Sequence, residues 1–206
     1  MLETDRAEEV LEETDMAFLF AQKYHSAMKN VGPVRKEMGE RTIFNILGPL
    51  TNPANASRQL LGVYDKELVE KLAEVLANLG VTRGMSVCGG DGLDEITVTG
   101  PTYCCEIKDG ELTSYEIIPE QFGLSTYPLA ELVGGTPEEN AQITKDILSG
   151  TLKGAKRDVV LMNAGIGIYL GSENLTMEEG IKKAEELINS GKAYEKMEEF
   201  VKATQQ

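Results

Sequence analysis

The chain has 206 residues, of which 41% are hydrophobic, and its 34 acidic and 20 basic side chains give a net charge of −14. This length predicts one domain, or one domain with a subdomain, and enough chain to bury a core. An acidic surface repels phosphate backbones, so we expect no nucleic-acid partner, and a single histidine excludes chemistry that needs several imidazoles. No segment is apolar over a membrane-spanning length, and the N-terminus is acidic rather than a basic signal region, so we expect no membrane partner.

The predicted elements begin with helical pieces over about the first 45 residues, at 6–13, 18–28 and 33–39. The next stretch, RTIFNILGPLTNP, breaks an apolar run twice, at Gly48-Pro49 and at Asn52-Pro53. Proline fixes its own φ and restricts the residue before it. The stretch is therefore either a helix that ends at a domain boundary or a segment that lines a site.

From residue 59 the pattern changes to alternating strands and helices. QLLGVYD predicts a short buried strand, residues 66–79 an amphipathic helix that ends at Gly80, and MSVCGG the next strand, followed by a turn in DGLDEIT. Asp109 and Gly110 predict a hairpin between strands at 103–108 and 111–118.

The C-terminal part continues with helices. Residues 136–148 and 176–188 each start with a threonine cap and have a glutamate three residues later; 193–203 is a third helix. DVVLMNAGIGIYL is interpreted as a strand running into a helix of small residues. Together these elements predict an α/β fold with a mostly parallel sheet flanked by helices, divided into a helical segment at 1–45 and an α/β domain at 46–206.

The three cysteines, Cys88, Cys104 and Cys105, have no metal-ligand spacing. We expect the neighbours Cys104 and Cys105 to alternate along a strand rather than form a disulfide. This favours a reducing compartment, and we expect a cytoplasmic protein.

Asp94 and Glu95 follow a predicted strand and two glycines in VCGGDGLDE. Two carboxylates in a turn at the carboxyl end of a strand suit Mg²⁺, which prefers oxygen ligands, although acidic residues are also common in ordinary turns. Arg35 could hold a carboxylate beside His25, or the two could be a surface arginine and a partly buried histidine. Residues 134–137, GGTP, could cradle a phosphate or simply form a turn and a helix cap. A dinucleotide-binding fingerprint is absent.

Longer motifs point to one family. The segment FLFAQKYHSAMKNVGPVRKEMGERTIFNILGPLTNPANAS resembles the central signature of the anthranilate phosphoribosyltransferases. The resemblance continues in order through QLLGVY, DGLDEIT, GELTSYEIIPEQFGL, GGTPEENA, RDVVLMNA and SGKA. It implies the C-terminal part of a nucleoside phosphorylase/phosphoribosyltransferase-type fold, with a remnant of a small helical subdomain at the N-terminus. It also implies an enzyme of tryptophan biosynthesis that joins anthranilate to the ribose carbon of phosphoribosyl pyrophosphate and releases pyrophosphate.

The resemblance also implies site residues. Arg35 matches the family's arginine for the anthranilate carboxylate, and His25 and Met28 match positions along the path of the aromatic acid. Pro49 matches a wall of that pocket, so the segment around it would be wall and hinge between the two parts. Asp94 and Glu95 match the carboxylate pair that binds a Mg²⁺ ion accompanying the pyrophosphate. The motifs of this chain include no catalytic side chain.

Two departures accompany the resemblance. Cys88 stands where the family often has a histidine, which we interpret as a tolerated change. The family's Gly-Thr-Gly-Gly-Asp phosphate loop and Lys-His-Gly-Asn segment do not occur in the sequence. We therefore expect an incomplete fragment, inactive by itself. Two alternatives remain, a binding module for an aromatic acid and one half of a split enzyme. We also expect a homodimer or higher oligomer, formed through apolar surface and a sheet edge that the absent part would cover.

Overall fold

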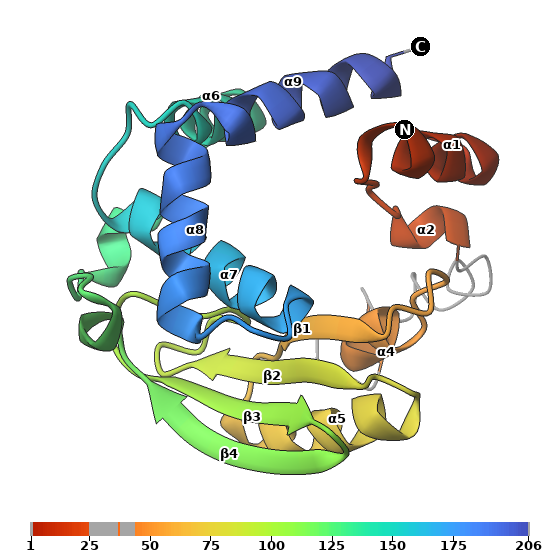
Figure 1. Cartoon of the computed structure of the whole chain (residues 1–206), viewed down its shortest axis with the longest axis vertical. Coiled ribbons are helices and arrows are strands. Elements are labelled where there is room, and N and C mark those ends of the chain that lie inside the picture. The colour runs from red at the N-terminus through yellow and green to blue at the C-terminus, as the bar shows by residue number, and fades with distance from the viewer. Residues whose placement is uncertain (1, 25–36, 38–43, 206) are drawn as a thin grey trace. The chain divides into compact units, whose positions relative to one another are not determined.

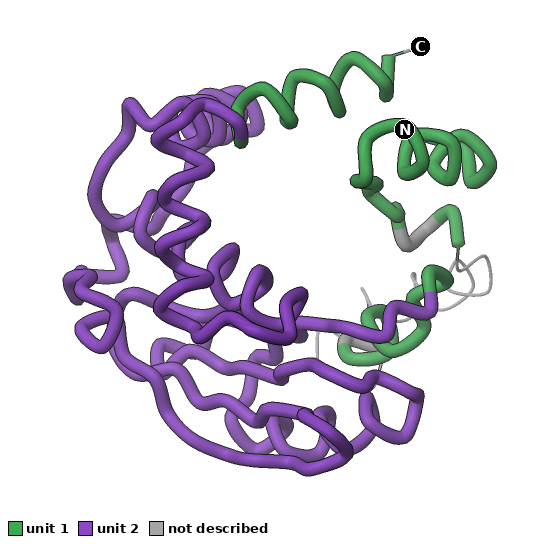
Figure 2. The backbone as a smooth tube through the Cα atoms, in the orientation of Figure 1, with its two compact units in different colours: residues 1–54, 193–206 green, residues 55–192 purple. Residues whose placement is uncertain are grey.

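The computed structural model describes residues 2–24, 37 and 44–205 (Figure 1). The chain forms two compact units, one of residues 1–54 and 193–206 and one of residues 55–192 (Figure 2). Compactness is a different criterion from function, so the division into functional domains at residue 45 stays a prediction.

The first unit is helical in its described part. It contains α1 (Thr4–Thr14), α2 (Ala21–Tyr24), α4 (Phe44–Leu50) and nearly all of α9 (Lys192–Thr204). Two long-range hydrogen bonds join its ends, because the Arg6 guanidinium donates to the Ala203 carbonyl (2.9 Å) and Lys196 donates to the Thr14 carbonyl (3.3 Å). The helices predicted at 6–13 and 193–203 are confirmed, whereas the one at 33–39 lies almost entirely outside the described residues.

The apolar run with two breaks forms a helix that ends abruptly. Helix α4 carries Pro49 in its last turn, and the backbone N–H of Thr51 donates to the Leu47 carbonyl at 3.1 Å. A turn follows, in which the Asn52 side chain accepts from the N–H of Ala54 at 3.0 Å. The border of the two compact units falls directly after this turn. The helix thus ends at the border of two compact units, and its role in lining a site stays a prediction.

The second unit is built on a four-stranded sheet with the order β1-β2-β3-β4. Its strands are β1 (Arg58–Gly62), β2 (Arg83–Gly89), β3 (Thr102–Lys108) and β4 (Glu111–Ile117). Among these described strands only β1 and β2 pair in parallel, and the other two pairings are antiparallel. The prediction of a mostly parallel sheet is therefore wrong for this chain, although the α/β architecture is confirmed.

The reason for the mixed sheet lies in the connections. Asp109 and Gly110 both have positive φ (53° and 82°), which closes the predicted tight hairpin between β3 and β4. The link from β2 to β3, residues 90–101, contains no helix. A parallel return needs a crossover that usually contains a helix, so β3 runs back beside β2 instead.

Helices cover both faces of this sheet. Helix α5 (Lys66–Asn78) packs on one face, α7 (Ala155–Gly171) packs on the other, and α8 (Met177–Asn189) packs against α7 (Figure 1). The unit also contains α6 (Pro137–Leu148) and short 3-10 turns at Pro119–Phe122 and Leu129–Glu131. As predicted, the hydroxyls of Thr136 and Thr176 cap α6 and α8, and each accepts from the backbone N–H three residues on.

Helix α7 corrects the interpretation of DVVLMNAGIGIYL, which is helical throughout rather than a strand leading into a helix. Its buried residues recur in adjacent pairs every four positions, which is a helical period: Leu161, Met162, Gly165, Ile166, Tyr169 and Leu170. An apolar run gives the same signal for a buried strand and a buried helix, and here its length decides for the helix.

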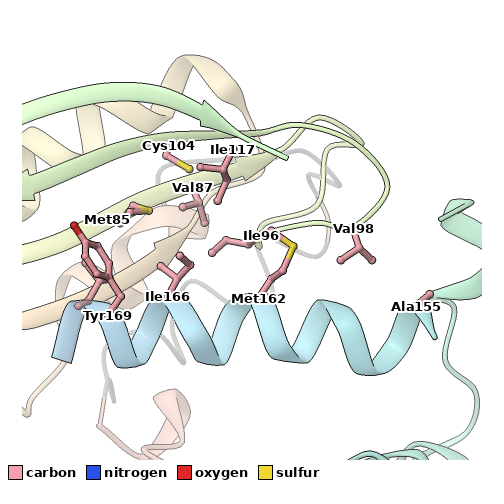
Figure 3. Packing of buried hydrophobic residues seen from close by; sticks show 11 residues of the cluster. Met85, Val87, Ile96, Val98, Cys104, Ile117, Ala155, Met162, Ile166 and Tyr169 are labelled. Carbon is pink, nitrogen blue, oxygen red and sulfur yellow. The ribbon is translucent and has the colours of Figure 1, made fainter. Parts of the chain in front are cut away.

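The hydrophobic core lies between α7 and the sheet (Figure 3). Met162 and Ile166 of α7 face Met85 and Val87 of β2, and Ile96 of the β2–β3 link joins them. The three cysteines are buried and free, which confirms that Cys104 and Cys105 form no disulfide. No helix in the described part of the chain could span a membrane.

Candidate functional site

The predicted carboxylate pair lies in the β2–β3 link, which we call the carboxylate loop (residues 90–101). This loop leaves the carboxyl end of β2, the strand that pairs in parallel with β1. Asp94 and Glu95 are both solvent-exposed, and within the described part of the chain neither forms an ion pair. The carboxyl ends of parallel strands are the usual position of ligand sites in α/β sheets. The fold thus presents two neighbouring, uncompensated carboxylates at such a position.

Gly62 allows the loop to approach the end of β1. A Cβ atom at this position would lie 1.6 Å from the carbonyl oxygen of Asp94 and 2.5 Å from its carbonyl carbon. No side chain tolerates such contacts with backbone, so only glycine lets the Asp94 backbone cross the end of the strand here. The glycine of the QLLGVY motif therefore has a direct role in placing the carboxylate pair.

Asp91 closes the loop on itself. Its Oδ2 accepts hydrogen bonds from the hydroxyls of Thr97 and Thr99, both at 2.6 Å, and its Oδ1 accepts from the N–H of Leu93 at 3.0 Å. Burial acts to raise the pKa of Asp91, but these hydrogen bonds outweigh it and leave the pKa lowered. Asp91 is thus an ionised structural carboxylate, distinct from the exposed pair beside it.

The loop carries concentrated negative charge. Partial burial raises the pKa of Glu95, and the neighbouring charges of Asp94 and Asp91 raise it further. The buried thiol of Cys88 has a raised pKa, first because of burial and then because of acidic side chains that include Asp65 and Asp91. Repulsion of this kind is relieved when a cation binds.

The donor set of the loop fits Mg²⁺ shared with a phosphate ligand. Mg²⁺ is commonly held by one or two carboxylates, with substrate phosphates and water completing its six oxygen ligands. Asp94 and Glu95 supply such oxygens. Within the described residues no group of three or more potential ligand side chains comes together, so nothing there forms a cage made of protein alone.

The roles of all the predicted site residues, the carboxylate pair included, stay predictions. His25, Met28 and Arg35 lie outside the described residues. Pro49 is half-buried in the last turn of α4. The structure therefore describes the surroundings of Asp94, Glu95 and Pro49 only.

Two surface hollows, of about 720 and 640 Å³, lie beside strand β4 rather than at the loop. Both include Tyr115 and Glu116, and neither includes Asp94 or Glu95. Both are open grooves away from the carboxylate loop, so we base the candidate site on the side-chain chemistry of the loop.

Besides Gly62, sequence reasoning missed two residues that shape the loop. One is Asp91, whose signal was present because an aspartate in a glycine turn followed by TVT can accept from the hydroxyls. The other is Asn163 of α7, which bonds to the backbone of Ile96. No local pattern indicates this contact, because 67 positions separate the two residues.

The chain matches the family described as "Glycosyl transferase family, a/b domain" over residues 1–194. An anthranilate phosphoribosyltransferase of Endomicrobium trichonymphae is 52% identical over 204 residues, which are 99% of this chain and 60% of the relative. The crystal structure of anthranilate phosphoribosyltransferase from Thermus thermophilus is similar with a TM-score of 0.90 and 42% identity, over 98% of this chain and 59% of that one.

A third relative is the Saccharomyces cerevisiae enzyme in complex with PRPP and Mg, with a TM-score of 0.89 and 33% identity over 98% of this chain and 58% of that one. This chain therefore spans about 60% of the length of the curated relatives it matches. The resemblance to anthranilate phosphoribosyltransferases and the corresponding fold type are confirmed. The chain belongs to the glycosyl transferase family with an α/β domain.

Proposed function

We propose that this chain is part of an anthranilate phosphoribosyltransferase, the enzyme that joins anthranilate to phosphoribosyl pyrophosphate and releases pyrophosphate in tryptophan biosynthesis. The observation that carries the proposal is the carboxylate loop, which presents Asp94 and Glu95 uncompensated at the carboxyl end of β2. The yeast relative with PRPP and Mg, and the same enzyme in complex with 4-fluoroanthranilate, support the choice of substrates and metal.

In this proposal Asp94 and Glu95 hold a Mg²⁺ ion against the diphosphate of the donor substrate. The ion, when bound, neutralises the charge that builds up on the leaving pyrophosphate. An acidic protein needs such a cation near a polyanionic substrate, because its own charge of −14 opposes the approach of phosphate. The loop contributes position, since Gly62 and Asp91 fix the backbone that carries the pair.

The acceptor side is assigned to four residues named by the resemblance. Arg35 would hold the anthranilate carboxylate through two parallel hydrogen bonds, a geometry that a guanidinium offers and an ammonium does not. His25 and Met28 would line the path of the aromatic acid, and Pro49 would form a wall of its pocket. In a catalytically competent form of the protein, Arg35→Ala should weaken anthranilate use by about 2–3 kcal/mol.

Steady-state kinetics with each substrate varied in turn tests Arg35. We expect Arg35→Lys to recover only part of the loss, and the apparent affinity for phosphoribosyl pyrophosphate to stay nearly unchanged. Equal damage to both substrates, or full recovery with lysine, would show that the residue is structural.

A direct test of the metal pair uses the 206-residue chain, Mn²⁺ as a paramagnetic substitute for Mg²⁺, and inorganic pyrophosphate. Mn²⁺ bound at the loop should broaden the backbone resonances of residues 92–96, and this broadening should vanish in Asp94→Asn/Glu95→Gln. Glu111→Gln, which neutralises an exposed carboxylate on β4, is the matched control and should behave as the wild type. Broadening that survives in the double variant would remove the metal role from this pair.

Turnover by the chain alone is a separate test. Since the phosphate-loop motifs are absent from the sequence, we expect no product from anthranilate and phosphoribosyl pyrophosphate with Mg²⁺. Product formed by the purified chain would contradict the expected inactive fragment. Activity that appears only when a second polypeptide is added would indicate a split enzyme, and anthranilate binding without any turnover would favour a binding module.

A further inference from the structure

Ile96 follows Glu95 directly and anchors the carboxylate loop in the core. Its side chain is fully buried beside Met162 of α7 (Figure 3). Its backbone makes two further bonds to α7, because its N–H donates to Oδ1 of Asn163 at 3.1 Å and its carbonyl accepts from Nδ2 of the same side chain at 2.7 Å. One amide group thus satisfies both backbone polar groups of the residue next to the carboxylate pair.

The orientation of the Asn163 amide is fixed by a third bond. Its Nδ2 also donates to the carbonyl of Val159, one turn earlier in α7, at 2.9 Å. In the opposite orientation the amide oxygen would face two carbonyl oxygens, and the amide nitrogen would face the N–H of Ile96. The contact is therefore a two-point clamp with a single workable geometry.

The carboxylate pair lies between two such constraints. On one side the Asp94 backbone rests against Gly62 at the end of β1, and on the other Ile96 is held by Asn163. Glu95 is the residue between them, so the direction of its side chain depends on both supports. Asp91, which bonds to Leu93, Thr97 and Thr99, keeps the rest of the loop closed but does not reach α7.

We propose that Asn163 is a positioning residue for the metal pair, which sets the geometry of Asp94 and Glu95 from helix α7 without touching the metal. This inference rests on the proposed function, because it assumes that the pair binds a cation with a diphosphate. Partners that orient metal ligands commonly change metal affinity by about 10- to 100-fold when they are removed. Asn163 has the same role as such a partner here, but it bonds to the backbone of Ile96 rather than to a side chain that would bind the metal.

The test compares four variants of the 206-residue chain with the wild type, using Mn²⁺ and inorganic pyrophosphate as the probe. Asn163→Leu removes all three hydrogen bonds of the amide and keeps the side-chain volume, whereas Asn163→Ala removes them with a smaller side chain. Asn163→Gln keeps the amide group on a side chain that is one methylene longer. Ile188→Val, in the buried face of α8, is the control that lowers global stability without touching the loop. Two quantities are measured, the affinity from broadening at residues 92–96 and the backbone hydrogen exchange of the carboxylate loop.

We expect Asn163→Leu and Asn163→Ala to bind the probe at least about 10-fold more weakly, with faster exchange in the loop, and Asn163→Gln to lie between them and the wild type. Ile188→Val should bind as the wild type does. Should Asn163→Leu fail to fold, the comparison of Asn163→Ala with Ile188→Val gives the result.

Two outcomes overturn the inference while leaving the proposed function intact. One is wild-type affinity in the Asn163 variants, and the other is an equal loss in Ile188→Val, which would show that affinity follows global stability alone. Absence of probe binding to the wild-type loop would overturn the metal role in the proposed function and this inference with it.

Discussion

Basic side chains lie at one end of the sheet and acidic side chains at the other, and the two groups differ in how many contacts they make within the protein. At one end Arg58, Arg83 and Lys108 are cross-strand neighbours on β1, β2 and β3. Both arginines contact other groups within the protein, although among the described residues only Arg58 forms an ion pair. Arg58 donates to the Leu170 carbonyl (3.1 Å) and to Glu173 (3.2 Å), and the Arg83 guanidinium lies over the ring of Tyr169, 4.6 Å from its centre.

At the other end the charge is only partly compensated. Asp91 has three donors within the loop, whereas Asp94 and Glu95 have no ion pair within the described part of the chain. The comparison separates charged side chains that have partners within the fold from charged side chains that have no ion pair within its described residues. Arg58, Arg83 and Asp91 have structural partners, whereas the exposed pair is the one that the proposed function assigns to a ligand.

The largest effect should come from Gly62, which lets the acidic loop cross β1. A Cβ atom in Gly62→Ala would meet the Asp94 carbonyl, and the required shift should lower the free energy of unfolding by about 2–3 kcal/mol. Chemical denaturation measures this loss. Gly100→Ala in the same loop is the control, since its Cβ would meet nothing within 4 Å, and a loss of equal size there would show that the close approach at Gly62 is unimportant.

Asp91→Asn should have the next largest effect, because one carboxylate oxygen becomes an NH2 group, which cannot accept from the donors that face it, either the two threonine hydroxyls or the N–H of Leu93. We expect a loss of about 1–2 kcal/mol at neutral pH. The folded-state pKa of Asp91 lies below its ordinary value of 3.8, so its stabilising contribution is present above that value and is lost as pH falls through the folded-state pKa. Denaturation at neutral pH and at pH about 3 should show the gap between wild type and variant narrowing in acid. A constant gap would mean that the charge of Asp91 contributes nothing.

Arg58→Ala tests the basic end. It removes a half-exposed ion pair and a hydrogen bond to the last turn of α7, so the loss should be about 0.5–1 kcal/mol. Thermal unfolding measures the loss, and Mn²⁺ broadening at residues 92–96 should not change. An altered metal affinity would show that the two ends of the sheet are coupled. The basic end could then no longer be separated from the carboxylate loop as purely structural.

The smallest effect should come from Glu95→Gln. The folded-state pKa of Glu95 is raised above 4.5, first by partial burial and then by Asp94 and Asp91, so its ionised form opposes folding as pH rises through that pKa. Neutralising this exposed group should raise stability at neutral pH by no more than a few tenths of a kcal/mol, with no gain in acid. A carboxyl NMR titration should also show the pKa of Glu95 falling when Mg²⁺ is added. If Glu95→Gln is less stable than the wild type, or if the pKa of Glu95 does not change with Mg²⁺, then Glu95 is not an uncompensated charge.

Local patterns predicted much of the fold. The caps Thr136 and Thr176, the turn at Asp109 and Gly110, and the apolar face of α5 each depend on neighbours within a few residues. Such short-range signals act in the same way wherever the segment lies. For the same reason the family could be identified from continuous motifs, and Asp94 and Glu95 could be placed at the end of a strand.

Two features could not be predicted from those short-range signals. One is whether the strands pair in parallel or antiparallel, and the other is whether one apolar run forms a strand or a helix. DVVLMNAGIGIYL could be strand or helix until it was packed, and the parallel character of the sheet depended on whether the β2–β3 link contained a helix. Composition could not answer either question, since apolar side chains are buried equally well in either state; the length of the run and the helix-free link answered them.

The sequence by itself determined which residues we propose to bind a cation, because carboxylate chemistry belongs to the side chains of Asp94 and Glu95. Only the tertiary structure decided which residues hold them in place. Gly62 and Asn163 meet the loop across 32 and 67 positions of the chain, through a backbone contact and a pair of hydrogen bonds. Contacts of this kind leave no local pattern, since they arise only when the end of β1 and the middle of α7 are folded against the same loop.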